Sequence, residues 1–304
     1  MLFRSWAGDP EGGAPYVEAS PTNPNALVGF DVEIAELMAR GLGLEPRFVL
    51  VQFASIDQSV ARGDAEIGLS GIEDSAARRA SMSVTLPYYE FREVLSVRDS
   101  DAAQFRRLAD LAGRRVGTLG GTLAYEILLA AERNYHLTAV SYEDDVHPFS
   151  DLALGRLDAV LLDNVLAERR RRKMGGFAIQ PESVAVGHYV GVLSKTNAVL
   201  RDRINDVLRT KMRDGTLEQI FKKWDVWNAD QPTFHQRVLN GDAIPAVVGL
   251  DVTSSVASET WWNTALAYLP LLLRASVVTL VLSCLSMALA VMLEIGRASC
   301  RERV

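Results

Sequence analysis

The sequence has few cysteines and histidines, and it carries no excess of positive charge. Two cysteines, Cys284 and Cys300, are too few for a disulfide framework or a structural zinc site. The four histidines are far apart and show no metal-ligand spacing. Lysine and arginine number 32 against 38 aspartate and glutamate residues, which gives a net charge of −6. We therefore expect neither a metal nor a nucleic-acid partner.

Motifs of the common enzyme classes are also missing. There is no Walker loop, no G-x-G-x-x-G and no nucleophile elbow, and the glycine-rich stretch 117–121 matches none of them. No Ser/His/Asp or Cys/His order stands out. The sequence therefore predicts a binding protein without a cofactor rather than an enzyme.

What is present is a pattern of alternating strands and helices. The 304 residues, 48% of them hydrophobic and 23% charged, are typical of a folded chain with about two domains. Residues 6–226 alternate in a way that favours an α/β fold with largely parallel sheets. Strands are predicted at 47–51, 65–69, 115–119, 157–162 and 189–193. Helices are predicted at 31–40, 123–133, 165–174, 198–212 and 217–224. One pattern, a helix end followed by Gly, an acidic residue and a strand, occurs at both 60–69 and 152–161 and indicates two similar lobes.

The C-terminal region changes in character. Residues 275–293 carry no charge over nineteen positions, which is enough for a helix to cross the hydrocarbon core of a bilayer. We predict a transmembrane helix at 268–293, with a buried core helix as the alternative. Residues 228–267 are richer in Pro, Asn, Ser and Thr and are predicted to be a linker.

Both ends of the sequence look foreign. Residues 1–5 and 294–304 resemble the translation of a sequencing-adapter oligonucleotide read on opposite strands. We expect them to be artefacts, and they are left out of the fold prediction. The basic run 169–173 stands at a predicted helix C-terminus, where cations are favoured, so a solvated helix face is expected there.

Polar residues follow three predicted strands, at the edge where open α/β sheets bind ligands. Ser70-Gly71 with the nearby Arg78 is the first group, Gly121-Thr122 at a helix start is the second, and Asp163 is the third. An arginine fork and a helix N-terminus attract a carboxylate, while an aspartate attracts an ammonium group. The pattern indicates a zwitterion site, although each group could also be a helix cap or a solvated face.

Several stretches resemble one known family. Gly29–Glu33, Arg62–Asp64, Ser70-Gly71, Arg78-Arg79 and Pro87–Tyr89 resemble the first half of the bacterial extracellular solute-binding proteins of family 3, the amino-acid receptors of ABC importers. Leu111–Gly117, Gly121-Thr122, Gly155–Ala159 and Gly215–Trp224 resemble the second half and the closing helix. The resemblance covers residues 6–228. It implies a two-lobed, periplasmic-binding-protein-like (type II) fold, with a solute-binding domain at 6–227.

The resemblance also implies lobe boundaries and residue roles. Lobe one would comprise 6–95 and 190–227, lobe two 96–189, and the hinge would lie near Ser96 and Gly191. Arg78 corresponds to the carboxylate-binding arginine and Asp163 to the amine-binding aspartate. The full set of expected ligand-binding residues is Asp9, Phe53, Ser70, Gly71, Glu73, Arg78, Gly121, Thr122 and Asp163.

Glu73 departs from the family pattern. The family has Ser or Thr five residues before the arginine, and this chain has Glu73 there. The second hydroxyl of the family's Gly-Thr-Thr is replaced by Leu123. The added acidity of Glu73, Asp9 and Glu11 favours a polar or cationic ligand.

The C-terminal run carries a second resemblance. Residues 268–280 are similar to the first transmembrane helix of polar amino-acid ABC permeases. The two resemblances together imply an amino-acid-binding component fused to a truncated permease, in the inner membrane, with the binding domain periplasmic or extracellular. A separate ABC ATPase and a permease would be its partners. The alternatives are the ligand-binding domain of a membrane sensor and a cyclohexadienyl dehydratase-like enzyme on the same fold.

Overall fold

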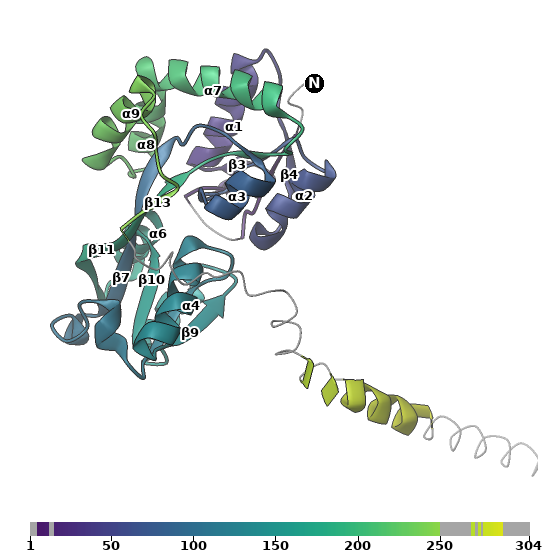
Figure 1. Cartoon of the computed structure of the whole chain (residues 1–304), viewed down its shortest axis with the longest axis vertical. Coiled ribbons are helices and arrows are strands. Elements are labelled where there is room, and N and C mark those ends of the chain that lie inside the picture. Colours follow the sequence, from purple (N-terminus) through teal and green to yellow (C-terminus); the bar gives the residue numbers. More distant parts are fainter. Residues whose placement is uncertain (1–4, 12–14, 250–268, 271–272, 275, 288–304) are drawn as a thin grey trace, which may run out of the picture. The chain divides into compact units, whose positions relative to one another are not determined.

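The computed structural model describes residues 5–11, 15–249, 269–270, 273–274 and 276–287 (Figure 1). The chain divides into two units, residues 1–252 and 253–304, and each is described by itself. The strands and the helices α1 to α9 named below all belong to the first unit.

The first lobe of this unit is built on a five-stranded sheet in the order β4-β1-β5-β12-β6. Strand β1 pairs in parallel with β4 and β5, whereas β12 runs antiparallel to β5 and β6. The strands are β1 (Ser5–Gly8), β4 (Arg47–Leu50), β5 (Ile67–Gly68), β6 (Ser83–Val84) and β12 (Val192–Leu193). The helices are α1 (Phe30–Gly41), α2 (Ile56–Arg62), α3 (Ala76–Ser81), α7 (Ala198–Arg213) and α8 (Thr216–Lys223). A short hairpin-like pair, β2 (Glu18–Ala19) and β3 (Leu27–Val28), completes this lobe.

The second lobe is built on a six-stranded sheet in the order β13-β11-β7-β10-β8-β9. Its strands are β7 (Tyr89–Arg98), β8 (Arg115–Leu119), β9 (Thr138–Tyr142), β10 (Ala159–Asp163), β11 (Phe177–Tyr189) and β13 (Val247–Val248). Its helices are α4 (Leu123–Tyr135), α5 (His147–Ala153) and α6 (Asn164–Met174). Strands β8, β9 and β10 are parallel, but β7 runs antiparallel to β10 and β11. The predicted two-lobed α/β architecture is present, and only part of this sheet is parallel.

The helices bury the faces that their sequence spacing predicts. In α8, Leu217, Ile220 and Phe221 recur at intervals of three and four residues, and all three are buried. Helix α4 begins after Thr122, whose hydroxyl accepts a hydrogen bond from the N–H of Tyr125. The observed bounds of both helices lie within two residues of the predicted ones.

Two chain segments connect the lobes. The first runs from β6 to β7 through residues 85–88, and the second runs from β11 to β12 through residues 190–191. The segments are hydrogen bonded to each other, because the Thr85 N–H donates to the Gly191 carbonyl at 2.9 Å. The Gly191 N–H donates in turn to the Thr85 hydroxyl at 2.8 Å. A paired, two-segment connection of this kind is typical of a hinge.

The first crossing lies earlier in the chain than the lobe boundary placed at 95/96. Residues 89–98 form β7 and pair with β10 and β11, so they belong to the second sheet. The chain therefore leaves the first lobe before Tyr89 rather than near Ser96. Its return through Gly191 is where the hinge was expected.

The linker prediction for 228–267 is wrong over its first part. Helix α9 (Asp230–Asn240) buries Phe234 and Val238, and β13 pairs antiparallel with the end of β11. The helix was missed because this stretch is mostly polar. Its two buried apolar residues, Phe234 and Val238, are four positions apart and face the core on successive turns. Residues 250–267 of the predicted linker lie outside the described residues.

The expectation of a solvated helix face at 169–173 is wrong for the first two residues of this run. The Arg169 and Arg170 side chains are only 15% and 14% exposed. Arg169 pairs with Glu18 at 2.9 Å, and Arg170 pairs with Asp145 at 2.7 Å. These two arginines face neighbouring acidic residues because they lie on the side of α6 that packs against the protein.

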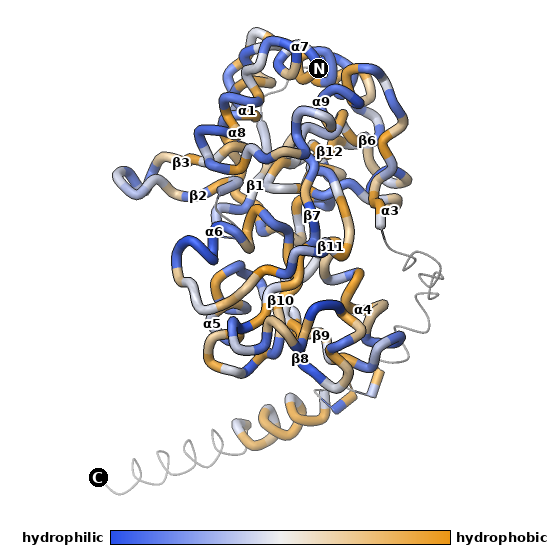
Figure 2. The backbone as a smooth tube through the Cα atoms, turned by 90° about the vertical axis from the view of Figure 1, so that its left-hand side faces the viewer, coloured by the Kyte–Doolittle hydropathy of each residue, from blue (hydrophilic) through white to orange (hydrophobic). Residues whose placement is uncertain are grey.

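The predicted membrane helix at 268–293 falls partly outside the described residues, which omit 268, 271–272, 275 and 288–293. Residues 276–287 are helical, and Figure 2 shows them in hydrophobic colours. Within the described part of the chain, no helix has both the length and the apolar character needed to cross a bilayer. The membrane span stays a prediction. The terminal stretches 1–4 and 294–304 also lie outside the described residues, whereas Ser5 is the first residue of β1.

Candidate functional site

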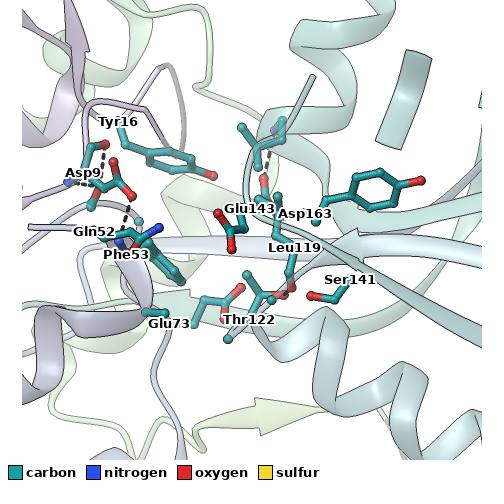
Figure 3. A pocket seen from close by; sticks show the side chains of 17 residues that line it. Asp9, Tyr16, Gln52, Phe53, Glu73, Leu119, Thr122, Ser141, Glu143 and Asp163 are labelled. Atoms are coloured by element: carbon teal, nitrogen blue, oxygen red, sulfur yellow. Dashed lines mark hydrogen bonds between the residues drawn. The ribbon is translucent and has the colours of Figure 1, made fainter. Parts of the chain in front are cut away.

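A cavity of about 280 Å³ lies between the lobes, where strands of both sheets end (Figure 3). Its wall includes residues that follow β1 and β5 in the first lobe and residues at the ends of β8, β9 and β10 in the second. Eight of the nine predicted ligand-binding residues line it: Asp9, Phe53, Ser70, Gly71, Glu73, Gly121, Thr122 and Asp163. The ninth, Arg78, does not.

Asp9 ties together three segments of the first lobe. Its Oδ2 accepts a hydrogen bond from the Phe53 N–H at 2.7 Å, and its Oδ1 accepts one from the Glu11 N–H at 2.9 Å. The Asp9 N–H donates to the Ser70 hydroxyl at 3.2 Å. With both carboxylate oxygens engaged, Asp9 positions the loop that presents the Phe53 ring to the cavity.

A strained turn follows β5. Ser70 has a φ of 144° and Gly71 a φ of 66°, both in the region that favours glycine. The Gly71 N–H donates to the buried Asp31 carboxylate at 2.6 Å, which stabilises the turn. A Cβ on Gly71 would lie 2.8 Å from the ring of Tyr16, so the close approach requires glycine. The turn directs the chain toward Glu73.

Glu73 connects the first lobe to the second at the edge of the cavity. It is 4% exposed, and its Oε2 accepts a hydrogen bond from the Leu123 N–H in the first turn of α4 at 2.6 Å. Burial raises the pKa of Glu73 to about 8, although the charge of Arg78 and the Leu123 N–H offset part of that shift. The carboxyl of Glu73 therefore lies at the helix N-terminus where the sequence predicts an anion.

Arg78 lies behind Glu73 rather than on the cavity wall. Its Nε donates to the Asp57 carboxylate at 2.8 Å, and its Nη1 donates to the Glu73 carbonyl at 2.7 Å. It lines a smaller neighbouring pocket of about 130 Å³, whose wall also includes Glu73 and Gly121. In this structure, Glu73 separates the Arg78 guanidinium from the main cavity.

Thr122 and Asp163 are both helix caps on the second-lobe wall. The Thr122 hydroxyl caps α4 and donates to the Leu119 carbonyl at 2.7 Å. One Asp163 oxygen accepts the Leu166 N–H at 2.9 Å and caps α6. Burial raises the pKa of Asp163 to about 6, and hydrogen bonding from Leu166, Tyr16 and Tyr189 offsets part of the shift. Capping and lining the cavity are compatible roles here.

Two tyrosines at the site were not predicted. The hydroxyls of Tyr16 and Tyr189 lie 2.6 Å apart, and their rings pack edge to face at 5.3 Å. Tyr16 lines the cavity (Figure 3). The two residues are 173 positions apart, so no local sequence pattern indicates that they meet.

A further wall segment was also missed. Ser141, Tyr142 and Glu143 lie at the end of β9 and line the cavity. Strand β9 is half-exposed and lacks a long apolar run, so no strand was predicted there. A strand prediction for 138–142 would have indicated these residues, because they stand at the same sheet edge as Asp163.

The cavity is acidic. Asp9, Glu73, Glu143 and Asp163 line it, and Figure 3 shows the Glu73 and Glu143 carboxyls in the space between the lobes. Among the described residues that line the cavity, none is a lysine, arginine or histidine. No group of three or more His, Cys, Asp and Glu within the described residues could hold a metal ion. The charge of the wall favours an organic cation.

One more carboxyl lies beneath the wall. Glu93 on β7 is fully buried, stands opposite Asp163 in the sheet register, and has no hydrogen-bond partner for either oxygen in the described part of the chain. Burial raises its pKa well above the ordinary value, and the nearby Glu73 and Asp163 raise it further. Glu93 is thus a fifth carboxyl near the cavity, and its raised pKa favours the protonated form.

The family model of the bacterial extracellular solute-binding proteins, family 3, matches residues 11–226. The chain belongs to this family. This chain is 26% identical over 205 residues to ABC transporter arginine-binding protein 1 of Escherichia coli K12. The alignment covers 66% of this chain and 82% of the relative. This chain is also 27% identical over 207 residues to the histidine-binding periplasmic protein of Salmonella typhimurium. That alignment covers 65% of this chain and 79% of the relative.

Among solved structures, the arginine-binding protein ArgBP of T. maritima, in its P235GK mutant form, is similar to this binding protein. The TM-score is 0.67 at 24% identity, with 74% of this chain and 95% of that chain covered. This likeness confirms the two-lobed type II fold. The relatives are solute-binding proteins rather than enzymes, which confirms the expectation from the missing catalytic motifs. The family match ends at residue 226 and does not support a fusion to a permease.

Proposed function

We propose that this chain is the extracytoplasmic binding component of an ABC importer for cationic solutes of the amino-acid class, comprising amino acids and the amines derived from them. One observation carries the proposal: four carboxyl groups line the interlobe cavity, and no cationic side chain of the described residues does. The similarity to arginine-binding and histidine-binding proteins supports the same class.

The geometry supports a role for each wall. Asp163 is the residue predicted to bind the ligand's amine. One of its oxygens caps α6, and the side chain is buried at the cavity. An ammonium group of the ligand would therefore compensate the Asp163 carboxylate for the water that it loses on burial. The rings of Tyr16 and Phe53 offer flat apolar surface for the aliphatic part of a ligand or for a guanidinium. The hinge segments at 85–88 and 190–191 would allow the lobes to close on the ligand.

The finer part of the proposal concerns the membrane. The uncharged run 275–293 supports attachment of the binding domain to the inner membrane, where a permease and a separate ABC ATPase would complete the importer. Tethering the receptor beside its permease would raise the local concentration of loaded receptor. Partition of the full chain into vesicles, compared with a chain ending at residue 249, tests this attachment separately from ligand binding.

A thermal-shift screen followed by calorimetry tests the ligand class. The panel would hold the twenty amino acids together with ornithine, agmatine, putrescine and cadaverine. Stabilisation by cationic members, and by none of the acidic amino acids, is the expected result. Stabilisation by glutamate or aspartate in preference to any cation would contradict the proposal.

A further inference from the structure

The Glu73 carboxyl lies where an anionic ligand group was expected. Two features were expected to bind a ligand α-carboxylate, the N-terminus of α4 and the guanidinium of Arg78. Glu73 lies between them: its Oε2 accepts from the Leu123 N–H at 2.6 Å, and its carbonyl accepts from Arg78. The Arg78 charge acts on the same carboxyl. Glu73 thus engages both partners that a ligand carboxylate would need, the helix N-terminus through its carboxyl and the guanidinium through its main-chain carbonyl.

The backbone around Glu73 is fixed to the hinge. The Asp74 N–H donates to the His188 carbonyl at 2.8 Å, and the Val190 N–H donates to the Ile72 carbonyl at 2.8 Å. These hydrogen bonds lie on either side of Glu73, and Glu73 itself forms an isolated antiparallel β-bridge with Tyr189. The main chain at Glu73 therefore cannot retreat without breaking the strand that connects the lobes, and only a side-chain rotation could vacate the position.

Electrostatics oppose such a rotation in favour of a ligand carboxylate. A displaced Glu73 would stay close to Asp163, Glu93 and Glu126, and an incoming carboxylate would bring a negative charge to a buried acidic cluster in which the pKa values of Glu73 and Glu93 are already raised. Arg78 would have to leave Asp57, with which it forms a 2.8 Å ion pair. Like charges placed together in a buried site cost free energy, whereas an ammonium or guanidinium group there gains it.

We propose that Glu73 is a built-in carboxylate in the place of a ligand α-carboxylate, so that the site selects amines and guanidines lacking that group over the corresponding amino acids. This inference rests on the proposed function, because it assumes that the interlobe cavity binds cationic solutes. It names Glu73 as the residue that determines specificity within that class.

Matched ligand pairs test the inference on the full chain purified in detergent. Agmatine and arginine differ only in the α-carboxylate, and so do cadaverine and lysine. Calorimetry at pH 8.5, above the raised pKa of Glu73, should give a dissociation constant at least tenfold lower for the carboxylate-free member of one pair or both. In Glu73→Thr, which restores the hydroxyl residue type of the family, the order should reverse.

Two variants keep the result interpretable. Glu126→Gln removes a carboxylate that lines the Arg78 pocket but not the main cavity, so it should leave the ligand order unchanged. Glu73→Gln keeps the size of the side chain and should reduce the discrimination if Glu73→Thr does not fold.

Each outcome has a distinct meaning. Tighter binding of arginine than agmatine by the unmodified chain would overturn the inference and leave the proposed function standing. Preference for agmatine that persists in both Glu73 variants would overturn the role of Glu73. Binding of none of the four ligands would overturn the proposed function itself, and the inference with it.

Discussion

The Glu73 carboxyl of the first lobe accepts a 2.6 Å hydrogen bond from the Leu123 N–H of the second lobe. This bond connects the lobes beside the cavity in which the solute is expected, because Glu73 lines that cavity and Leu123 lines the smaller neighbouring pocket. A group that links the two lobes and lines the cavity couples ligand binding to lobe closure, because a change at either affects the other. The titration of Glu73 should therefore be visible in ligand affinity.

The first prediction is that affinity for a carboxylate-free cation rises with pH. The pKa of Glu73 is raised to about 8 and that of Asp163 to about 6, mainly by burial. A bound cation favours the charged carboxylates and lowers both pKa values, so binding near pH 7 releases protons. We expect agmatine affinity to rise roughly tenfold between pH 6.5 and about pH 9 and to level off above the raised pKa of Glu73.

Calorimetry in two buffers of different ionisation enthalpy measures the released protons directly. The groups that face Glu73 are Arg78, Glu126, Glu93 and Asp163, and burial raises the pKa of each of the three acids as well. A ligand whose own carboxylate displaced Glu73 would require that residue to be protonated, and its affinity would fall with pH. Proton uptake on agmatine binding would contradict the prediction.

The second prediction concerns stability. Burial raises the pKa of Asp31 to about 7, and hydrogen bonds from Gly71 and Tyr88 offset only part of that shift. The folded state therefore binds more protons than the unfolded state between about pH 4 and pH 7, so the free energy of unfolding falls as pH rises through this window. The contribution is roughly 4 kcal/mol. Urea unfolding of Asp31→Asn should show a flatter pH dependence than the unmodified chain.

The third prediction concerns the turn after β5. Gly71→Ala should lower the free energy of unfolding by about 2–4 kcal/mol, because φ is 66° and the new Cβ would lie 2.8 Å from the Tyr16 ring. Gly113→Ala is the matched control: its φ is 71° and nothing lies within 4 Å of the added Cβ. It should cost about 1 kcal/mol. Equal losses in the two variants would show that contact with Tyr16 is unimportant.

The fourth prediction concerns a second link between the lobes. Arg169 on α6 and Glu18 on β2 form a 2.9 Å ion pair whose side chains are 15% and 27% exposed. Arg169→Ala should weaken ligand binding by roughly threefold to tenfold, as expected for a partly buried pair. Small-angle scattering with ligand should also give a larger radius of gyration. Arg171→Ala is the control, because Arg171 pairs with Glu168 on its own helix, and equal affinities in the two variants would contradict the prediction.

Local patterns predicted those parts of the site that depend on strand and helix ends. Thr122 and Asp163 each stand where a strand passes into a helix, so both their capping and their place at the cavity could be foreseen. Tyr16 could not be foreseen, since its position depends on Tyr189, far away in the sequence. Long-range contacts of this kind leave no periodic signal in the chain.

Arg78 differs from its predicted position because its guanidinium binds groups of the protein itself. Arg78 was placed at the site on residue type and spacing, but its guanidinium bonds to Asp57, 21 positions earlier, and to the Glu73 carbonyl. The added carboxylate of Glu73 was recognised as a departure from the family. Its direction toward α4 follows from the fold of both lobes and not from neighbouring residues.

The last prediction separates two roles for Arg78. If Arg78 acts through Glu73, as its 2.7 Å bond to the Glu73 carbonyl and its charge indicate, Arg78→Ala raises the pKa of Glu73 and weakens agmatine binding. The loss should be several-fold at pH 7 and should shrink at pH 9, because a larger fraction of Glu73 is charged there in both proteins. Arg78→Lys keeps the charge and should lose less.

A direct clamp on a ligand α-carboxylate would behave differently. It would cost arginine about a hundredfold or more in Arg78→Ala at both pH values and would leave agmatine untouched, because agmatine has no carboxylate to pair. Titrating both ligands into both variants at pH 7 and pH 9 therefore distinguishes the two roles. A pH-independent loss confined to arginine would establish Arg78 as a ligand contact and place Glu73 outside the carboxylate position.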